Sequence, residues 1–86
     1  MHRLRFGRDA EKALARMPRD QARRIRAGID RLAQDPWAPN LDVRRLKGQR
    51  GFRLRIGDWR VIYEIDTEEG TIVIARLRPR GGAYQD

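Results

Sequence analysis

Residues 51–66 constrain the fold more than any other stretch, because they predict a β-hairpin with a fixed register. Their sequence is GFRLRIGDWRVIYEID, in which apolar residues alternate with mostly basic ones on either side of Gly57 and Asp58. A two-residue loop sets which residues of the two strands lie opposite each other. The expected pairs are Ile56 with Trp59, Arg55 with Arg60, Leu54 with Val61, and Arg53 with Ile62. One face of the hairpin is therefore apolar and the other is basic.

The basic face brings two like charges together. Placing Arg55 directly opposite Arg60 costs roughly 0.2 to 1 kcal/mol, and a chain selected only to fold would avoid it. Guanidinium groups carry forked donors that suit phosphate oxygens, so the pair favours a site for an anion. The alternative interpretation is that Arg53, Arg55 and Arg60 are simply solvated on an open sheet face.

The charge balance also favours an anionic partner. The 86 residues hold 20 Lys and Arg against 12 Asp and Glu, a net charge of +8, and polyanion binding is the first expectation. The chain has no cysteine and one histidine, which excludes disulfides, thiolate metal sites and cysteine nucleophiles and makes a zinc site implausible. We expect one domain over residues 1–86, without a metal or a cofactor.

The other segments predict an α+β domain. Residues 2–6 alternate weakly as a first strand, and apolar residues recur at helical spacing over 10–17 and 22–33, on either side of Pro18. Residues 43–48 could begin a strand, and 71–77 predict another after a turn at 67–70. We expect the helical hairpin to pack on the apolar face of an antiparallel meander of three or four strands.

This arrangement leaves a basic sheet face uncovered. The residues expected on it or at its borders are Lys47, Arg53, Arg55, Arg60, Arg78, Arg80 and Tyr84. Alternation does not settle which face Arg76 and Arg78 take, because Ile72 and Val73 make both faces of the last strand apolar. Trp59 and Tyr63 share the apolar face of the hairpin, and we assign both to packing.

Such a face has the parts to hold an RNA backbone and stack a base. RNA cleavage by its own 2′-hydroxyl is the reaction that it could support, since the substrate supplies the nucleophile. Arginines suit the charged pentacoordinate phosphate but remain protonated and transfer protons poorly. Lys47 and Tyr84 have more attainable pKa values, and Glu64 is a further candidate base, although we favour Glu64 as a counter-charge for Arg60.

Three motifs carry a resemblance to a known family. They are LKG at 46–48, FRLRIGDWRVIYEID at 52–66 and RPRGGAY at 78–84. Together they resemble the RelE/ParE superfamily of bacterial and archaeal toxins from type II toxin–antitoxin modules, and within it the RelE branch. The preceding strand and helical hairpin are in the right order, so the resemblance covers essentially the whole chain and implies a RelE-like fold.

The resemblance implies a metal-independent, ribosome-dependent endoribonuclease. Such an enzyme cuts mRNA in the ribosomal A site, leaves 2′,3′-cyclic phosphate and 5′-hydroxyl ends, and inhibits translation. It implies that Arg60 contacts the scissile phosphate, that Tyr84 stacks on an mRNA base, and that Arg78 or Arg80 assists the leaving group. The expected catalytic residues are therefore Arg55, Arg60, Arg78, Arg80 and Tyr84, and the expected RNA-binding residues are Arg45, Lys47 and Arg53.

The resemblance also implies partners. These are the ribosome and mRNA, a cognate RelB-like antitoxin that holds the toxin inactive, and operator DNA bound only through the antitoxin complex. The N-terminus lacks the apolar core of a signal peptide, and no run is long enough to span a bilayer. We therefore expect a cytoplasmic protein without a membrane partner.

The founding RelE has lysines on the first hairpin strand where this chain has Arg53 and Arg55, so the general base of the reaction is not identified.

Two functions other than RNA cleavage stay open. A ParE-like gyrase poison would share the fold but generally lacks the basic and aromatic site residues. A catalytically inactive module that binds nucleic acid or an antitoxin is the third possibility.

Overall fold

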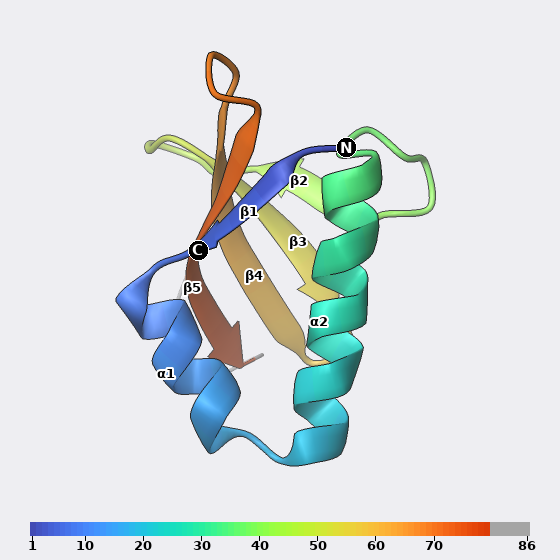
Figure 1. Cartoon of the computed structure of the whole chain (residues 1–86), viewed down its shortest axis with the longest axis vertical. Helices are drawn as coiled ribbons and strands as arrows, with labels where there is room; N and C mark the ends of the chain where they lie inside the picture. Colours follow the sequence, from blue (N-terminus) through green and yellow to red (C-terminus); the bar gives the residue numbers. More distant parts are fainter. Residues whose placement is uncertain (80–86) are drawn as a thin grey trace.

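The computed structural model describes residues 1–79, in which two helices pack on one face of a five-stranded sheet (Figure 1). The elements in chain order are β1 (Arg3–Phe6), α1 (Arg8–Arg16), α2 (Arg19–Gln34), β2 (Val43–Arg45), β3 (Phe52–Ile56), β4 (Trp59–Asp66) and β5 (Thr71–Pro79). The predicted α+β class and the predicted order of a strand, two helices and a meander are confirmed. Neither helix of the described chain is long and apolar enough to cross a membrane.

The sheet has the strand order β1-β5-β4-β3-β2. Strands β2 to β5 form the predicted antiparallel meander, and β1 pairs with β5 in parallel at the opposite edge from β2. The register of the β3–β4 hairpin matches all four predicted pairs. Gly57 has a φ of 57°, which suits the first central position of a two-residue hairpin turn.

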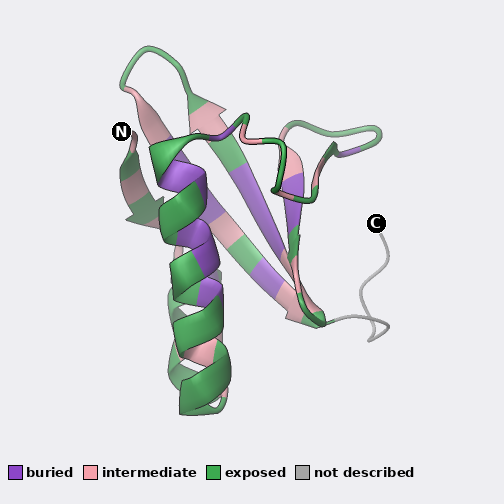
Figure 2. Cartoon of the chain, turned by 90° about the vertical axis from the view of Figure 1, so that its right-hand side faces the viewer, coloured by how far each residue is buried: buried purple, intermediate pink, exposed green. Residues whose placement is uncertain are grey.

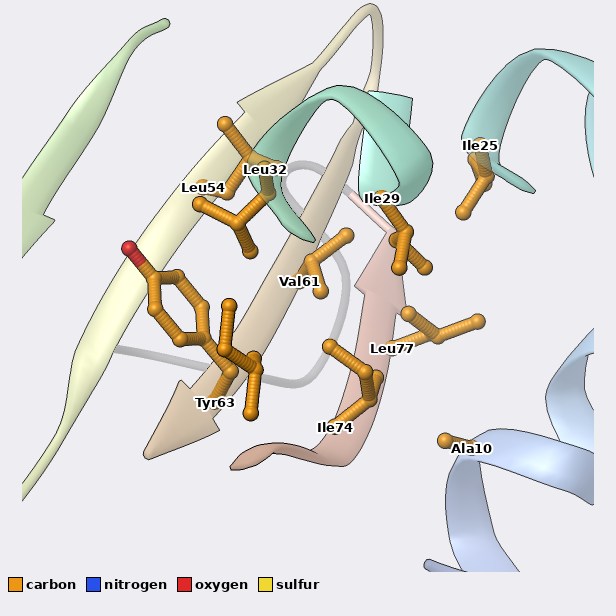
Figure 3. Close-up of a cluster of buried hydrophobic side chains, with 10 residues drawn as sticks. Ala10, Ile25, Ile29, Leu32, Leu54, Val61, Tyr63, Ile74 and Leu77 are labelled. Carbon is orange, nitrogen blue, oxygen red and sulfur yellow. The ribbon is translucent and has the colours of Figure 1, made fainter. Parts of the chain in front are cut away.

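The hydrophobic core lies between α2 and the covered face of the sheet. Figure 2 shows the buried residues of α2 as a stripe on the side toward the strands. Ile25, Ile29 and Leu32 from this stripe meet strand side chains that include Leu54 and Val61 (Figure 3). Burying one such side chain contributes roughly 1.5 to 3 kcal/mol, so this packing holds the meander in place. Within residues 1–79, both helices lie on this face, and the other face of the sheet carries neither of them.

The two aromatic residues assigned to packing do pack, although Trp59 is only partly buried. Tyr63 is 1 % exposed and stacks on Phe52, with ring centroids 5.5 Å apart. Burial raises the pKa of Tyr63 to about 12, further from neutral pH than that of an exposed tyrosine. Trp59 lies at the edge of the core, and its Nε1 donates a hydrogen bond to Gln21 Oε1 at 3.2 Å. Tyr63 therefore packs the two strands of the hairpin against each other, and Trp59 connects the hairpin to α2 through Gln21.

Candidate nucleic-acid interface

The sheet face opposite the helices carries a row of arginines that crosses three strands. Arg55 of β3 lies opposite Arg60 of β4, as predicted, and Arg60 lies opposite Arg78 of β5. Neighbouring strands are about 4.8 Å apart, so the three side chains leave the sheet side by side. Arg78, expected at the border of this face, is therefore a member of the row. We call Arg55, Arg60 and Arg78 the arginine row.

A β-bulge in β5 puts Arg78 on this face. Ile62 pairs with Arg76 but Tyr63 pairs with Ile74, which leaves Ala75 as an extra residue in β5. The extra residue reverses the alternation, so that side chains on both sides of it, Ile74 and Leu77, enter the core. The bulge thereby sends Arg76 and Arg78 to the open face, a question that the alternation of the sequence leaves unsettled.

Arg78 is held in place by neighbouring groups. Its Nη1 donates a hydrogen bond to the Leu77 carbonyl oxygen at 3.2 Å, and its Nη2 lies 4.0 Å from Asp9 Oδ2 on α1. The Asp9 side chain is 61 % exposed and that of Arg78 is 32 % exposed. An ion pair this exposed stabilises by only about 0 to 1 kcal/mol, so its main consequence is to orient the Arg78 guanidinium while leaving it accessible.

Arg53 lies on the same face but is far less exposed than expected. It keeps only 8 % of its surface accessible, and its Nη2 lies 3.3 Å from Asp42 Oδ1. Within residues 1–79 its buried Nε has no hydrogen-bond partner. The predicted placement of Arg53 on the face of Arg55 is therefore right, whereas the predicted open exposure is wrong, because the side chain is buried and contacts Asp42. Its role in RNA binding stays a prediction.

Replacing Asp42 with alanine should lower the free energy of unfolding by about 1 to 3 kcal/mol, because it leaves a buried cation without its acceptor. Equilibrium urea unfolding measures the change. Asp30→Ala is the matched control, since Asp30 Oδ1 also lies 3.3 Å from an arginine, Arg26, but both side chains are about half exposed. That pair should contribute about 0.3 to 0.5 kcal/mol. Equal losses in the two variants would contradict the importance of burial at Arg53.

The predicted RNA-binding residues Lys47 and Arg45 take different positions. Lys47 lies in the loop after β2 and lines a pocket of about 270 Å³ together with Arg53. Arg45 lines the same pocket, but it pairs with Phe52 and its guanidinium carbon lies 5.5 Å from the centre of that ring, a cation–π contact. The structure thus brings Lys47 to the edge of the basic face and sets Arg45 apart from the arginine row.

Further basic residues share the open face but were not among the predicted site residues: Arg44, Arg76 and, at the β1 edge, Arg3 and Arg5. Arg44 pairs with Arg53 across β2 and β3, and Arg76 lies across from Ile62. The sequence predicts that residues 43–48 could begin a strand, but not that Arg44 pairs with Arg53 across β2 and β3. The bulge in β5, which places Arg76, is not apparent from the sequence pattern. Arg80 and Tyr84 lie outside the described residues, and their proposed roles stay predictions.

Comparison with known proteins identifies the family. Residues 4–84 match the family model described as the ParE toxin of type II toxin–antitoxin systems. The RelE1 protein of Methanocaldococcus jannaschii is 31 % identical over 77 residues, which cover 87 % of this chain and 86 % of that protein.

Solved structures agree with this match. A chain of the archaeal RelE–RelB complex from Pyrococcus horikoshii superimposes with a TM-score of 0.80 at 34 % identity, covering 95 % of this chain and 98 % of that one. The Mycobacterium tuberculosis RelBE2 toxin–antitoxin complex contains a chain with a TM-score of 0.78 and 27 % identity, covering 92 % and 98 %. The chain therefore belongs to the RelE/ParE superfamily, the toxins of type II toxin–antitoxin systems.

Proposed function

We propose that this toxin is an endoribonuclease that cleaves mRNA in the ribosomal A site and so inhibits translation in the cytoplasm. The observation that carries the proposal is the arginine row on the sheet face that the helices leave open. Three opposed cations cost folding free energy, and forked guanidinium donors match the oxygens of a phosphate. The resemblance of the sequence to the RelE branch supports cleavage as the reaction that follows binding.

The row suits a reaction in which the substrate supplies its own nucleophile. The 2′-oxygen attacks the adjacent phosphorus, the bond to the 5′-oxygen breaks, and the proton lost from the 2′-hydroxyl is balanced by one gained at the leaving 5′-oxygen. The products are a 2′,3′-cyclic phosphate and a 5′-hydroxyl. Arg60, in the centre of the row, stabilises the pentacoordinate phosphate, and Arg55 and Arg78 hold it from either side. The proposed reaction needs no cofactor or metal.

A cognate RelB-like antitoxin is the proposed partner that keeps the toxin inactive. The relatives of known structure from P. horikoshii and M. tuberculosis were solved as toxin–antitoxin complexes. We further propose that operator DNA is bound only through such a complex. The basic face of the free toxin then remains committed to the ribosome and its mRNA.

Primer extension on a defined mRNA, translated in vitro with and without the purified toxin, tests the proposed activity. We expect discrete cuts within codons in the A site, and the cuts should disappear when ribosomes are left out. A second assay measures inhibition of DNA supercoiling by gyrase. It tests the alternative ParE-like function, since the family model is described as ParE. Absence of cuts at a toxin concentration that arrests growth would overturn the proposal, and gyrase inhibition would then favour a ParE-like activity.

A further inference from the structure

A second cross-strand row lies beside the arginine row on the open face. It runs from Arg44 on β2 through Arg53 and Ile62 to Arg76 on β5. In β3, β4 and β5 its members are two residues away from those of the arginine row, a distance of about 6.8 Å along an antiparallel strand. This is close to the step between successive phosphates in an extended RNA strand. A backbone that places one phosphate on the arginine row can therefore place a neighbouring phosphate on the second row.

Within the second row, Arg76 is the arginine best placed to receive a phosphate near Arg60 and Arg78. Arg53 is buried and contacts Asp42, whereas Arg76 is exposed. Ile62, between them, is 7 % exposed and offers no polar side-chain group. Among residues 1–79, no hydrogen bond or ion pair involves the Arg76 side chain. Arg76 therefore presents its donors without a competing acceptor in its own row.

On the far side of the second row from the arginine row, the open face becomes less suitable for binding phosphate. Past the bulge, the next pair across β4 and β5 on the open face is Glu64 with Val73, and Glu64 is exposed. A carboxylate there would repel a phosphate. The basic surface next to Arg60 on β4 thus extends for two rows and is followed by a carboxylate, whereas the cation of that third row, Arg5, lies two strands away on β1 beside Val73. This arrangement fits two successive phosphates along β4 and opposes a third at Glu64.

The bulge at Ala75 gives this placement a structural cause. Without the extra residue, the alternation set by Ile72 and Ile74 would turn Arg76 and Arg78 into the core and Leu77 outward. Bulges are known to redirect side chains next to functional sites. Here a single bulge redirects an arginine of each row, one in the arginine row and one beside it.

From these observations we propose that Arg76 forms a phosphate-binding subsite for the mRNA nucleotide next to the cleaved bond. The inference rests on the proposed ribonuclease function and extends it. Arg76 binds and positions the RNA and does not touch the reacting atoms. Because this contact is equally strong before and during the reaction, its loss should weaken binding without slowing the chemical step.

The first experiment compares single-turnover cleavage of ribosome-bound mRNA by the wild type and by Arg76→Ala. We expect the toxin concentration for half-maximal cleavage to rise about tenfold, with the rate at saturation unchanged. Arg76→Lys should recover part of the loss, because lysine keeps the charge but lacks the fork. Arg23→Ala is the matched control. It removes the same positive charge, but from an exposed position on α2, away from the open face of the sheet. Equal effects in Arg76→Ala and Arg23→Ala would overturn the subsite.

The second experiment identifies the phosphate. A set of mRNAs is prepared in which each carries one uncharged methylphosphonate linkage, at a different position around the cleaved bond. Neutralising the phosphate that Arg76 binds should weaken wild-type cleavage about tenfold and should have little further effect in Arg76→Ala. If the loss caused by the neutral linkage and the loss caused by Arg76→Ala added at every linkage position, the inference would be overturned, while ribonuclease activity would still be established. If the wild type cuts no mRNA at all, the proposed function itself fails, so the two failures are distinguishable.

Discussion

Replacing Arg60 with alanine is expected to lower the rate of ribosome-dependent mRNA cleavage by about 10² to 10³-fold, the typical cost of removing one donor that stabilises charge in a transition state. Arg60 lies between Arg55 and Arg78 in the arginine row, so no other single change removes a cation from the centre of the site. Single-turnover cleavage at saturating toxin measures the chemical step. The loss should appear in this rate, in contrast to the loss expected for Arg76→Ala.

Two companion variants separate the chemistry of Arg60 from its charge. Arg60→Lys keeps the charge without the planar fork and should fall between the wild type and Arg60→Ala. Arg31→Ala removes one charge from the exposed surface of α2 and should cleave at the wild-type rate. Circular dichroism checks that each variant is folded. A folded Arg60→Ala that cleaves normally would sink the proposed role of the arginine row.

The part of this site that the sequence predicts is the part that one hairpin encodes. A two-residue turn and strict alternation are local features, and together they determine that Arg55 faces Arg60. The same reasoning predicts two helices on the apolar face, because their periodicity is also local. The order of the predicted elements puts Arg78, Arg80 and Tyr84 at the border of the basic face, and the family resemblance implies their roles, but neither says how Arg78 is placed relative to Arg60.

The remaining features depend on contacts between distant parts of the chain. The bulge at Ala75 is hidden because β5 is apolar on both faces over Ile72 and Val73, so an extra residue leaves no mark on the pattern. The burial of Arg53 depends on Asp42, which lies in the segment before β2 and is brought close only when β2 pairs with β3. The parallel pairing of β1 with β5 likewise joins the two ends of the described chain.

Gly51 links the stability of the hairpin to the geometry of the site, because it precedes β3 in a conformation that other residues rarely adopt. Its φ is 106°, and an added Cβ would lie 2.7 Å from the Tyr63 carbonyl oxygen. Neither this backbone atom nor the buried Tyr63 ring can move without disturbing the core. Gly51→Ala should therefore lower the free energy of unfolding by about 3 kcal/mol, from left-handed backbone strain and from overpacking.

Gly48→Ala is the matched control for this prediction. Gly48 also has a positive φ, 71°, but an added Cβ there would meet nothing within 4 Å. It should lose only the backbone contribution, about 1 kcal/mol, so the difference between the two variants in urea unfolding isolates the contact with Tyr63. Relief of that contact would shift the start of β3, which carries Arg53 and Arg55, so Gly51→Ala should also cleave mRNA more slowly than Gly48→Ala. Equal stability losses would show that β3 absorbs the methyl group without moving, and the coupling between Gly51 and the arginine row would then be wrong.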